Sequence, residues 1–407
     1  MYTLILSLLV LMIDSGASEE YVLTKVLALS RHNVRTPLAT DLGKFSSNPW
    51  PKWADKNGYL TAKGAALEGM MGEYFYQWLT EQSLLPDGCP KGNDVYVYAN
   101  TKQRTLASAR AFVEKAFPGC NITVHRSEDT EEDEMDPIFN PVVHNTSAVF
   151  KEIVLSEMKE HLKGLNLNSS LEELSNILNY KESPRCKEEM KCNLISETNK
   201  PIIELGEKPL VKGPLKIGNS VSDSFTMEYY EGFPLKDVAW GKLTNRKQWV
   251  NLLELNRAYH NVIFNNSLAP KDIAEPLIEY INDRLFKDDF KFTLIVGHDS
   301  NMYTILNSLN FKSYNLNNQY EKTPVGGKIV FQKWHDLKTD NDFVKINYVY
   351  QSTKQLRKGI KLDLDNPPQF ELLELVECKA NEQGFCLWTD FKKIFRDLLN
   401  KYKAKTN

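Results

Sequence analysis

The chain has 407 residues, of which 42% are hydrophobic, 25% charged and 11% aromatic, and its formal net charge is -3. This composition is typical of a globular protein with about two or three domains, and it excludes a collagen-like repeat and a cysteine-dense miniprotein. The small negative charge argues against a nucleic-acid-binding protein that relies on bulk positive charge.

The first residues predict export. Residues 4–13 form an apolar run, LILSLLVLMI, which is too short to span a bilayer and is typical of a signal peptide. Small residues follow, so we expect residues 1–17 to be a signal peptide that is cleaved after Ala17. The alternative is a buried first strand or helix. No later apolar run approaches the length of a spanning helix, so we expect a secreted or periplasmic protein without a membrane partner.

Strands and helices alternate in the first and last parts of the chain. We expect strands at residues 21–29, 94–99, 292–296, 328–334 and 344–350, and helices at residues 101–116 and 301–309. The middle is mostly helical, with helices expected at residues 150–162, 171–180 and 247–264. This alternation predicts an α/β domain, residues 18–135 and 266–407, whose sheet is covered on both faces, interrupted by a mostly helical cap, residues 136–265.

The six cysteines predict disulfides in an exported protein. Six cysteines allow 15 pairings, and the sequence alone does not choose among them. Proximity along the chain favours Cys186–Cys192 and Cys378–Cys386 and leaves Cys89–Cys120. The competing interpretation is a zinc site, but the chain has no C-x-x-C motif and its histidines are scattered, so we expect no metal.

The strongest local signal is the segment RHNVRTP, residues 31–37, directly after the first predicted strand. Open α/β sheets build their sites at the carboxyl ends of strands. Arg31 and Arg35 offer planar, permanently charged donors that match phosphate oxygens, and a neutral His32 between them is a candidate nucleophile for phosphorus. The alternative is an ordinary basic surface loop.

Two further strand ends carry compatible groups. His298 and Asp299 follow the predicted strand at residues 292–296, where His298 can donate to a phosphoryl oxygen and Asp299 can act as a general acid. The alternative role for Asp299 is a helix cap. Arg104 stands at the start of the helix after the second strand and can hold a phosphate. Together the three strand ends predict phosphoryl chemistry at one edge of the sheet.

With these motifs the chain resembles the histidine acid phosphatase branch of the histidine phosphatase superfamily, which has Arg-His-x-x-Arg-x-Pro near the N-terminus and a distal His-Asp. Within that branch it is most similar to the glucose-1-phosphatase group, on segments such as YANTKQRTLASARAFVEKAFPGC, GPLKIGNSVSDSFTMEYYEGFP and TPVGGKIVFQKWHD. It shares that group's Asn33, where most members of the branch carry Gly. The resemblance implies a mixed central sheet with helices on both faces, an inserted helical cap, no cofactor, and the same disulfide pairing as proximity favours.

The resemblance also implies roles for the site residues. His32 resembles the nucleophile that forms a phosphohistidine, and Asp299 resembles the proton donor to the leaving group. The residues that would hold the phosphoryl oxygens are Arg31, Arg35, Arg104 and His298. Because His32 must be unprotonated while Asp299 must carry a proton, we expect an acidic pH optimum.

The expected function is an exported acid phosphatase that hydrolyses a small phosphomonoester, such as glucose 1-phosphate. The alternatives are a phytase or broad-specificity acid phosphatase, a phosphotransferase or mutase with the same histidine chemistry, and a non-catalytic exported binding protein. In the glucose-1-phosphatase group a sugar-contacting Glu precedes the GP-L-K segment. Here that position falls on Glu207 or Lys208, so the role stays unassigned.

Overall fold

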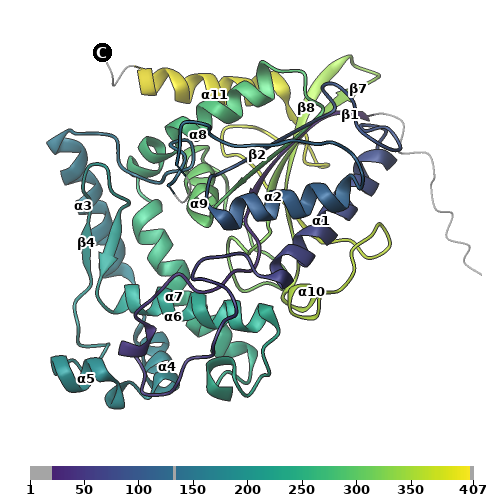
Figure 1. The fold of residues 1–407 in the computed structure, drawn as a ribbon. Helices are drawn as coiled ribbons and strands as arrows, with labels where there is room; N and C mark the ends of the chain where they lie inside the picture. Colours follow the sequence, from purple (N-terminus) through teal and green to yellow (C-terminus); the bar gives the residue numbers. More distant parts are fainter. Residues whose placement is uncertain (1–20, 132–133, 404–407) are drawn as a thin grey trace, which may run out of the picture.

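The computed structural model describes residues 21–131 and 134–403, so the expected signal peptide lies outside the described residues. Its centre is an eight-stranded mixed sheet in the order β10-β8-β7-β1-β6-β2-β3, with β9 paired to β8 (Figure 1). The parallel strands are β1 (Tyr21–Arg31), β2 (Val95–Ala99), β3 (Val124–His125) and β6 (Phe292–Gly297). The antiparallel strands are β7 (Lys328–Asp336), β8 (Asn341–Tyr350), β9 (Gln369–Leu372) and β10 (Cys386–Leu387).

Helices cover both faces of this sheet. One face packs against α1 (Ala62–Glu81) and α2 (Gln103–Ala116), and the other packs against α8 (Ala269–Phe286), α9 (Asp299–Ser308) and α11 (Trp388–Lys403). The side chains of β1 alternate between the two layers: Val26 and Ala28 belong to the first core, Leu27 and Leu29 to the second. A strand buried on both faces reads as a continuous apolar run, which is why the sequence reveals it. The predicted fold class is confirmed.

The middle of the chain builds a third hydrophobic core, to which α8 and α9 also contribute. Figure 1 shows its helices gathered beyond one end of the sheet. They are α3 (Ala148–Gly164), α4 (Asn168–Leu178), α5 (Pro184–Glu189), α6 (Pro214–Glu231) and α7 (Arg246–Phe264), with the hairpin β4 (Lys200–Ile202) and β5 (Leu210–Lys212). Their apolar faces share one cluster that includes Val154, Leu174, Phe225 and Leu252. Short elements complete the chain: η1 (Leu42–Lys44), η2 (Tyr180–Glu182), η3 (Val238–Gly241) and α10 (Thr353–Lys358).

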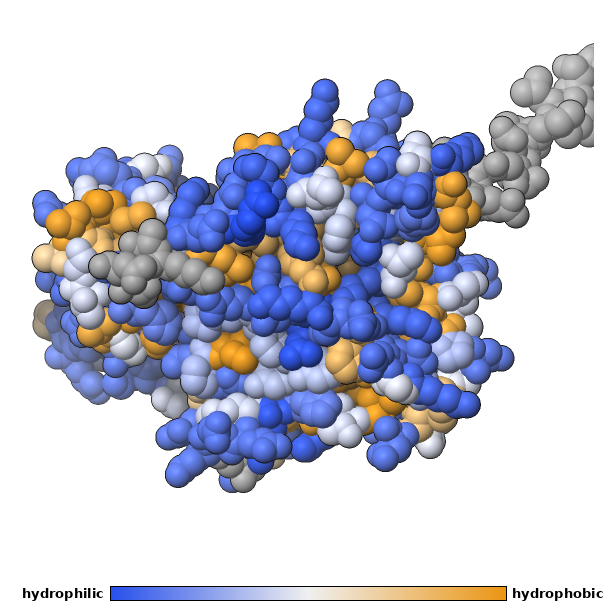
Figure 2. Space-filling model, turned by 90° about the horizontal axis from the view of Figure 1, so that it is seen from above, coloured by the Kyte–Doolittle hydropathy of each residue, from blue (hydrophilic) through white to orange (hydrophobic). Residues whose placement is uncertain are grey.

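The surface is predominantly polar. The face shown in Figure 2 is mostly hydrophilic, and its hydrophobic residues lie in small separate groups. Within the part of the chain that the structure describes, no helix has the length and apolar character needed to cross a membrane.

Three disulfides tie loops to the helices and strands. Cys89–Cys120 joins the loop after α1 to the loop after α2, and spans 31 residues. The other two close short loops: Cys186–Cys192 spans 6 residues and Cys378–Cys386 spans 8. These are the pairs that proximity favoured and the resemblance implied.

Loop length predicts that these bridges differ in their contribution to stability. On the chain-entropy model, closing a 31-residue loop contributes about 3–4 kcal/mol and the shortest loop only about 2 kcal/mol. We therefore expect Cys89→Ser/Cys120→Ser to lower the midpoint of urea unfolding more than Cys186→Ser/Cys192→Ser, measured on the same oxidised preparation. Equal losses in the two double variants would contradict this ranking.

Candidate active site

The register of the sheet brings the three predicted loops together. Arg31 of β1 is paired in parallel with Gly297 of β6, and Ala99 of β2 is paired with Val296. The loops that follow β1, β2 and β6 therefore leave the sheet next to one another, at one edge. The backbone N–H of His32 donates to the carbonyl of Gly297 at 3.0 Å, which joins the first of these loops to the end of β6.

His32 is held as a neutral imidazole in one tautomer. Its side chain is buried, and Nδ1 lies 2.8 Å from the carbonyl oxygen of Asn33. Because a carbonyl only accepts hydrogen bonds, Nδ1 carries the proton and Nε2 keeps its lone pair. Burial lowers the pKa of His32 well below 6.5, and the positive charges of Arg104, Arg35 and Arg31 lower it further. A neutral ring with a free Nε2 is the form that can attack phosphorus.

Three arginines surround this histidine. Arg31 donates to Glu321 at 2.8 Å, and Arg35 makes two hydrogen bonds to Asp223, at 3.0 and 3.1 Å. The Nε atoms of Arg31, Arg35 and Arg104 are buried, and no described residue accepts a hydrogen bond from them. Burial and the charge of Arg35 lower the pKa of Arg104 to about 10, so Arg104 remains cationic at neutral pH. Such a set of guanidinium donors matches the oxygens of a phosphoryl group.

His298 completes the cluster of donors. Its Nε2 lies 2.6 Å from Nδ2 of Asn100, whose amide oxygen accepts from the backbone N–H groups of Thr101 and Asp136. That orientation makes Nε2 the acceptor, so the proton of His298 sits on Nδ1, 3.3 Å from a guanidinium nitrogen of Arg104. Two neighbouring donors of this kind can bind one shared anionic oxygen.

Asp299 is the first residue of α9, and one of its oxygens is 3.7 Å from the guanidinium of Arg31 and 3.8 Å from Nε2 of His260. Burial raises the pKa of Asp299, but the positive charges of Arg31, His260 and Lys208 outweigh it and bring the pKa well below 3.8. Asp299 is therefore ionised in the free protein. It can donate a proton only after a bound anion has raised its affinity for one.

Several residues in and around this site carry no signal in the sequence. Asp223 comes from α6, His260 from α7, and Glu321 from the loop before β7. Asp223 lies in the segment GPLKIGNSVSDSFTMEYYEGFP, which carries part of the resemblance, but that segment does not assign it a role. The buried side chains of Arg31 and Arg35 require carboxylate partners, but local sequence does not say which ones. Asn100 follows the predicted second strand, and His260 lies within the predicted helix at residues 247–264, but neither position indicates a role in the site.

Lys208, rather than Glu207, faces the site. Its Nζ lies 5.2 Å from the ring centroid of Phe264, which is 6.2 Å from the ring of His260. Burial lowers the pKa of Lys208, while the charge of Asp299 opposes that shift. The side chain of Glu207 is exposed. The residue that approaches the site at this position is thus a cation.

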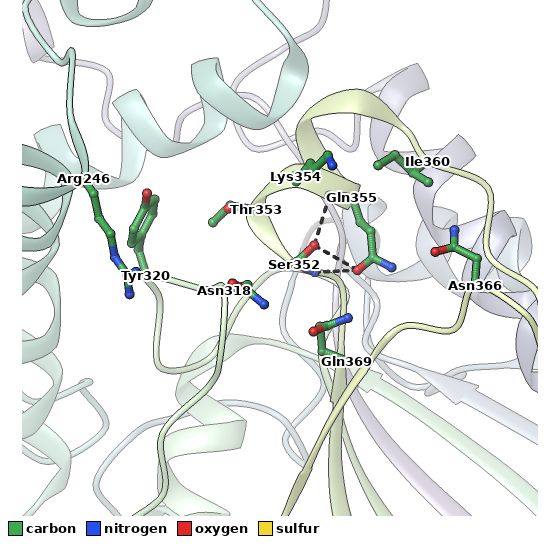
Figure 3. Close-up of a pocket in the computed structure, with 10 residues that line it drawn as sticks. All are labelled: Arg246, Asn318, Tyr320, Ser352, Thr353, Lys354, Gln355, Ile360, Asn366 and Gln369. Carbon is green, nitrogen blue, oxygen red and sulfur yellow. Dashed lines mark hydrogen bonds between the residues drawn. The ribbon is translucent and has the colours of Figure 1, made fainter. Parts of the chain in front are cut away.

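A separate pocket of about 400 Å³ lies beside α10 (Figure 3). Ser352 and Gln355 line it, and their side chains bond to each other as the cap of that helix. None of the six predicted site residues lines this pocket, and it contains no histidine or carboxylate. It lacks the groups that phosphoryl transfer requires.

Comparison with known proteins agrees with this geometry. Residues 22–349 match the histidine phosphatase superfamily (branch 2). The chain is 43% identical to the glucose-1-phosphatase of Providencia rettgeri, covering 96% of this chain and 95% of that protein. It is also 43% identical to the glucose-1-phosphatase of Salmonella typhimurium, covering 92% of each. The apo form of Hafnia alvei phytase superposes with a TM-score of 0.86 at 28% identity, covering 94% of this chain and 98% of that one. The chain belongs to the histidine phosphatase superfamily, branch 2.

The electrostatics of His32 predict an acid-shifted pH profile. His32 gains a proton as pH falls through its pKa, so the lowered pKa keeps this candidate nucleophile neutral well below pH 6.5. Among the charged groups around His32, Arg104 lowers its pKa the most, so Arg104→Gln should raise that pKa and move the acidic limb of kcat/KM to higher pH. We also expect kcat/KM to fall by about 10²-fold, because a phosphoryl-binding donor is lost.

The measurement is kcat/KM as a function of pH with p-nitrophenyl phosphate. Ionisation of this substrate affects all variants equally, so a difference between their profiles comes from the protein. Arg110→Gln, at an exposed position of the same helix, is the matched control. An acidic limb that stays in place in Arg104→Gln would refute the electrostatic account, and so would an optimum above pH 8.

Proposed function

We propose that this protein is an exported acid phosphatase that hydrolyses a sugar phosphate, such as glucose 1-phosphate, through a phosphohistidine on His32. The observation that carries the proposal is the free Nε2 of a neutral His32 among the unpartnered Nε donors of Arg31, Arg35 and Arg104. The 43% identity to glucose-1-phosphatases over most of the chain supports the substrate class.

In the first step Nε2 of His32 attacks phosphorus in line, and a P–N bond forms while the P–O bond to the leaving group breaks. The arginines and Nδ1 of His298 donate to the phosphoryl oxygens, whose charge they stabilise in the transition state. Asp299 gives its proton to the departing oxygen, so the sugar leaves as a neutral alcohol.

In the second step water attacks the phosphohistidine. Asp299, now ionised, takes a proton from that water, the P–N bond breaks, and neutral His32 is restored. The proton that Asp299 needs at the start can arrive with the substrate, because a phosphomonoester has a second pKa of about 6 and binds as a monoanion in acid. Acidic pH therefore suits both residues.

The two domains expected from the sequence have different roles in this proposal. We infer that residues 136–265 act as a cap on the α/β domain, residues 18–135 and 266–407. The cap would supply Asp223 to hold Arg35 and His260 to contact Asp299. The sugar would then bind between the cap and the sheet edge.

The proposed location is the periplasm or the extracellular space. Three disulfides are expected where thiols are oxidised. Cleavage of residues 1–17 after Ala17 remains part of the proposal, and mass spectrometry of the N-terminus of the exported protein tests it.

A second candidate function is hydrolysis of substrates that carry more than one phosphate, including phytate. Lys208 and Lys216 favour it, because both are cations on the cap side of the site. Lys216 lies 5.4 Å from the ring of Tyr259, the neighbour of His260, and its side chain is exposed. The similarity to the Hafnia alvei phytase fits this alternative.

The nucleophile is tested by His32→Ala. We expect kcat to fall by about 10³-fold or more, because no other group can accept the phosphoryl. His144→Ala, at an exposed histidine, is the control and should keep full activity. Wild-type protein that reacts with ³²P-labelled substrate at acidic pH and is quenched in alkaline denaturant should carry label on the peptide that contains His32.

Full turnover in a correctly folded His32→Ala protein would disprove the phosphohistidine. Transfer of the label mainly to an alcohol acceptor rather than to water would instead favour a phosphotransferase. A wild-type protein that turns over no phosphomonoester would favour a binding protein.

The substrate class is tested by Lys208→Gln. We expect kcat/KM for a sugar bisphosphate to fall more than kcat/KM for glucose 1-phosphate, by roughly fivefold, because a partly exposed ion pair contributes up to about 1 kcal/mol. Lys212→Gln, at an exposed lysine on β5, is the matched control. If Lys208→Gln changes both substrates equally, Lys208 does not select for a second anionic group.

A further inference from the structure

A closed set of hydrogen bonds lies on the Nδ1 side of His32. The Asn33 carbonyl that receives the Nδ1 proton belongs to a residue whose own side chain is fully buried. Nδ2 of Asn33 donates to Oε2 of Glu68 at 2.9 Å, and its Oδ1 accepts from the backbone N–H of Val34 at 2.9 Å. The side chain of Asn33 therefore anchors the peptide whose carbonyl orients the nucleophile.

Glu68 is itself fixed by a buried lysine. Lys328, the first residue of β7, lies 2.7 Å from Oε1 of Glu68, and both side chains have 0% exposure. The ammonium group of Lys328 also donates to Oγ of Ser30 at 3.1 Å and to the carbonyl of Gly326 at 2.9 Å, so all its protons are used.

The network returns to His32 on its other side. The backbone N–H of Gly326 donates to the carbonyl of His32 at 3.1 Å. Gly326 has a φ of +66°, and a Cβ added there would lie 2.3 Å from Nδ2 of Asn33. The backbone at Gly326 thus passes so close to Asn33 that only glycine fits at this position. The same backbone forms hydrogen bonds with both Lys328 and His32.

An ion pair of this kind is poorly explained by stability alone. A buried pair contributes little net stability compared with apolar side chains of similar size, because both charges lose their hydration. Its value here lies in geometry, since it gives Asn33 a fixed acceptor and connects α1, β7 and the loop after β1.

We propose that Asn33, Glu68 and Lys328 are positioning residues, which hold the Asn33 carbonyl against Nδ1 and so keep Nε2 of His32 unprotonated and aimed at the substrate. The inference rests on the proposed role of His32 as nucleophile. None of the three touches the reacting atoms; they act through the peptide of Asn33.

The test is Glu68→Met/Lys328→Met, which removes both charges and keeps the volume. Asn33 then loses its acceptor, and we expect kcat for p-nitrophenyl phosphate to fall roughly tenfold to hundredfold, as for other small displacements of a reacting group. KM should change by less than about threefold, because the phosphoryl-binding arginines keep their partners.

The matched control removes a comparable ion pair at the other end of β1. Lys25 lies 3.2 Å from Asp288, and both side chains are largely buried. Lys25→Met/Asp288→Asn should change the unfolding midpoint without lowering kcat. A loss of kcat there equal to that of the test variant would mean that any buried pair matters, and would overturn the proposal.

A second readout does not depend on turnover. The ¹⁵N shifts of the His32 ring, assigned with His32→Ala, report which nitrogen carries the proton. We expect one Nδ1-protonated form in the wild type and a mixture of tautomers in Glu68→Met/Lys328→Met. If that variant does not fold, Glu68→Gln replaces it: the amide still accepts from Lys328 but turns an N–H toward Asn33, so kcat should fall and the mixture should appear.

If kcat and the His32 tautomer are both unchanged in Glu68→Met/Lys328→Met, the positioning role is wrong. Label trapped on His32 would still support the proposed phosphohistidine. The reverse result, an active His32→Ala protein, would remove the proposed function itself. The two failures are therefore distinguishable.

Discussion

The buried positive charge around His32 is the constraint on which the rest of this structure depends. Buried guanidinium groups repel one another and lose hydration, and carboxylates beside Arg31 and Arg35 offset that cost. The three carboxylates near them are not equivalent. Asp223 accepts two hydrogen bonds from Arg35, and Glu321 accepts one from Arg31 at 2.8 Å. Asp299 lies farther away, at 3.7 Å from Arg31. The carboxylate with the longest contact, Asp299, is the one proposed to transfer a proton.

The same charges determine the state of the histidine. Desolvation alone favours a neutral imidazole, and the surrounding cations strengthen that preference. A neutral ring still has two tautomers, and charge does not choose between them. That choice is made by the backbone carbonyl of Asn33, so the peptide after His32 needs as firm a support as the ring of His32 itself.

Much of the fold follows from local sequence, and the exceptions have identifiable causes. The doubly buried strands β1 and β6 are apolar runs followed at once by polar motifs, which made both strands and site predictable. Helix α1 was not predicted, since it contains Gly64, Gly69 and Gly72, which disfavour helix. A Cβ at Gly72 would lie 2.4 Å from the carbonyl of Phe112, so close packing of α1 on α2 overrides propensity.

The predicted site residues and the residues that support them differ in how readily the sequence reveals them. The six predicted residues follow strand ends, and the structure brings them together. Asp223, His260 and Glu321 reach the same place from distant elements, and only tertiary structure reveals them. The hairpin β4–β5 was missed for a local reason: its strands have three residues each, and one contains Pro201.

The long sequence separation of the ion pairs has a consequence for how the protein matures. Arg35 and Asp223 are 188 residues apart, and Arg31 and Glu321 are 290 apart. During synthesis the arginines leave the ribosome long before their carboxylates do. The N-terminal segment cannot bury them alone, so its compact state is disfavoured until most of the chain is present. If the proposed export holds, such delayed closure would leave the chain unfolded for long enough to pass through a translocation channel.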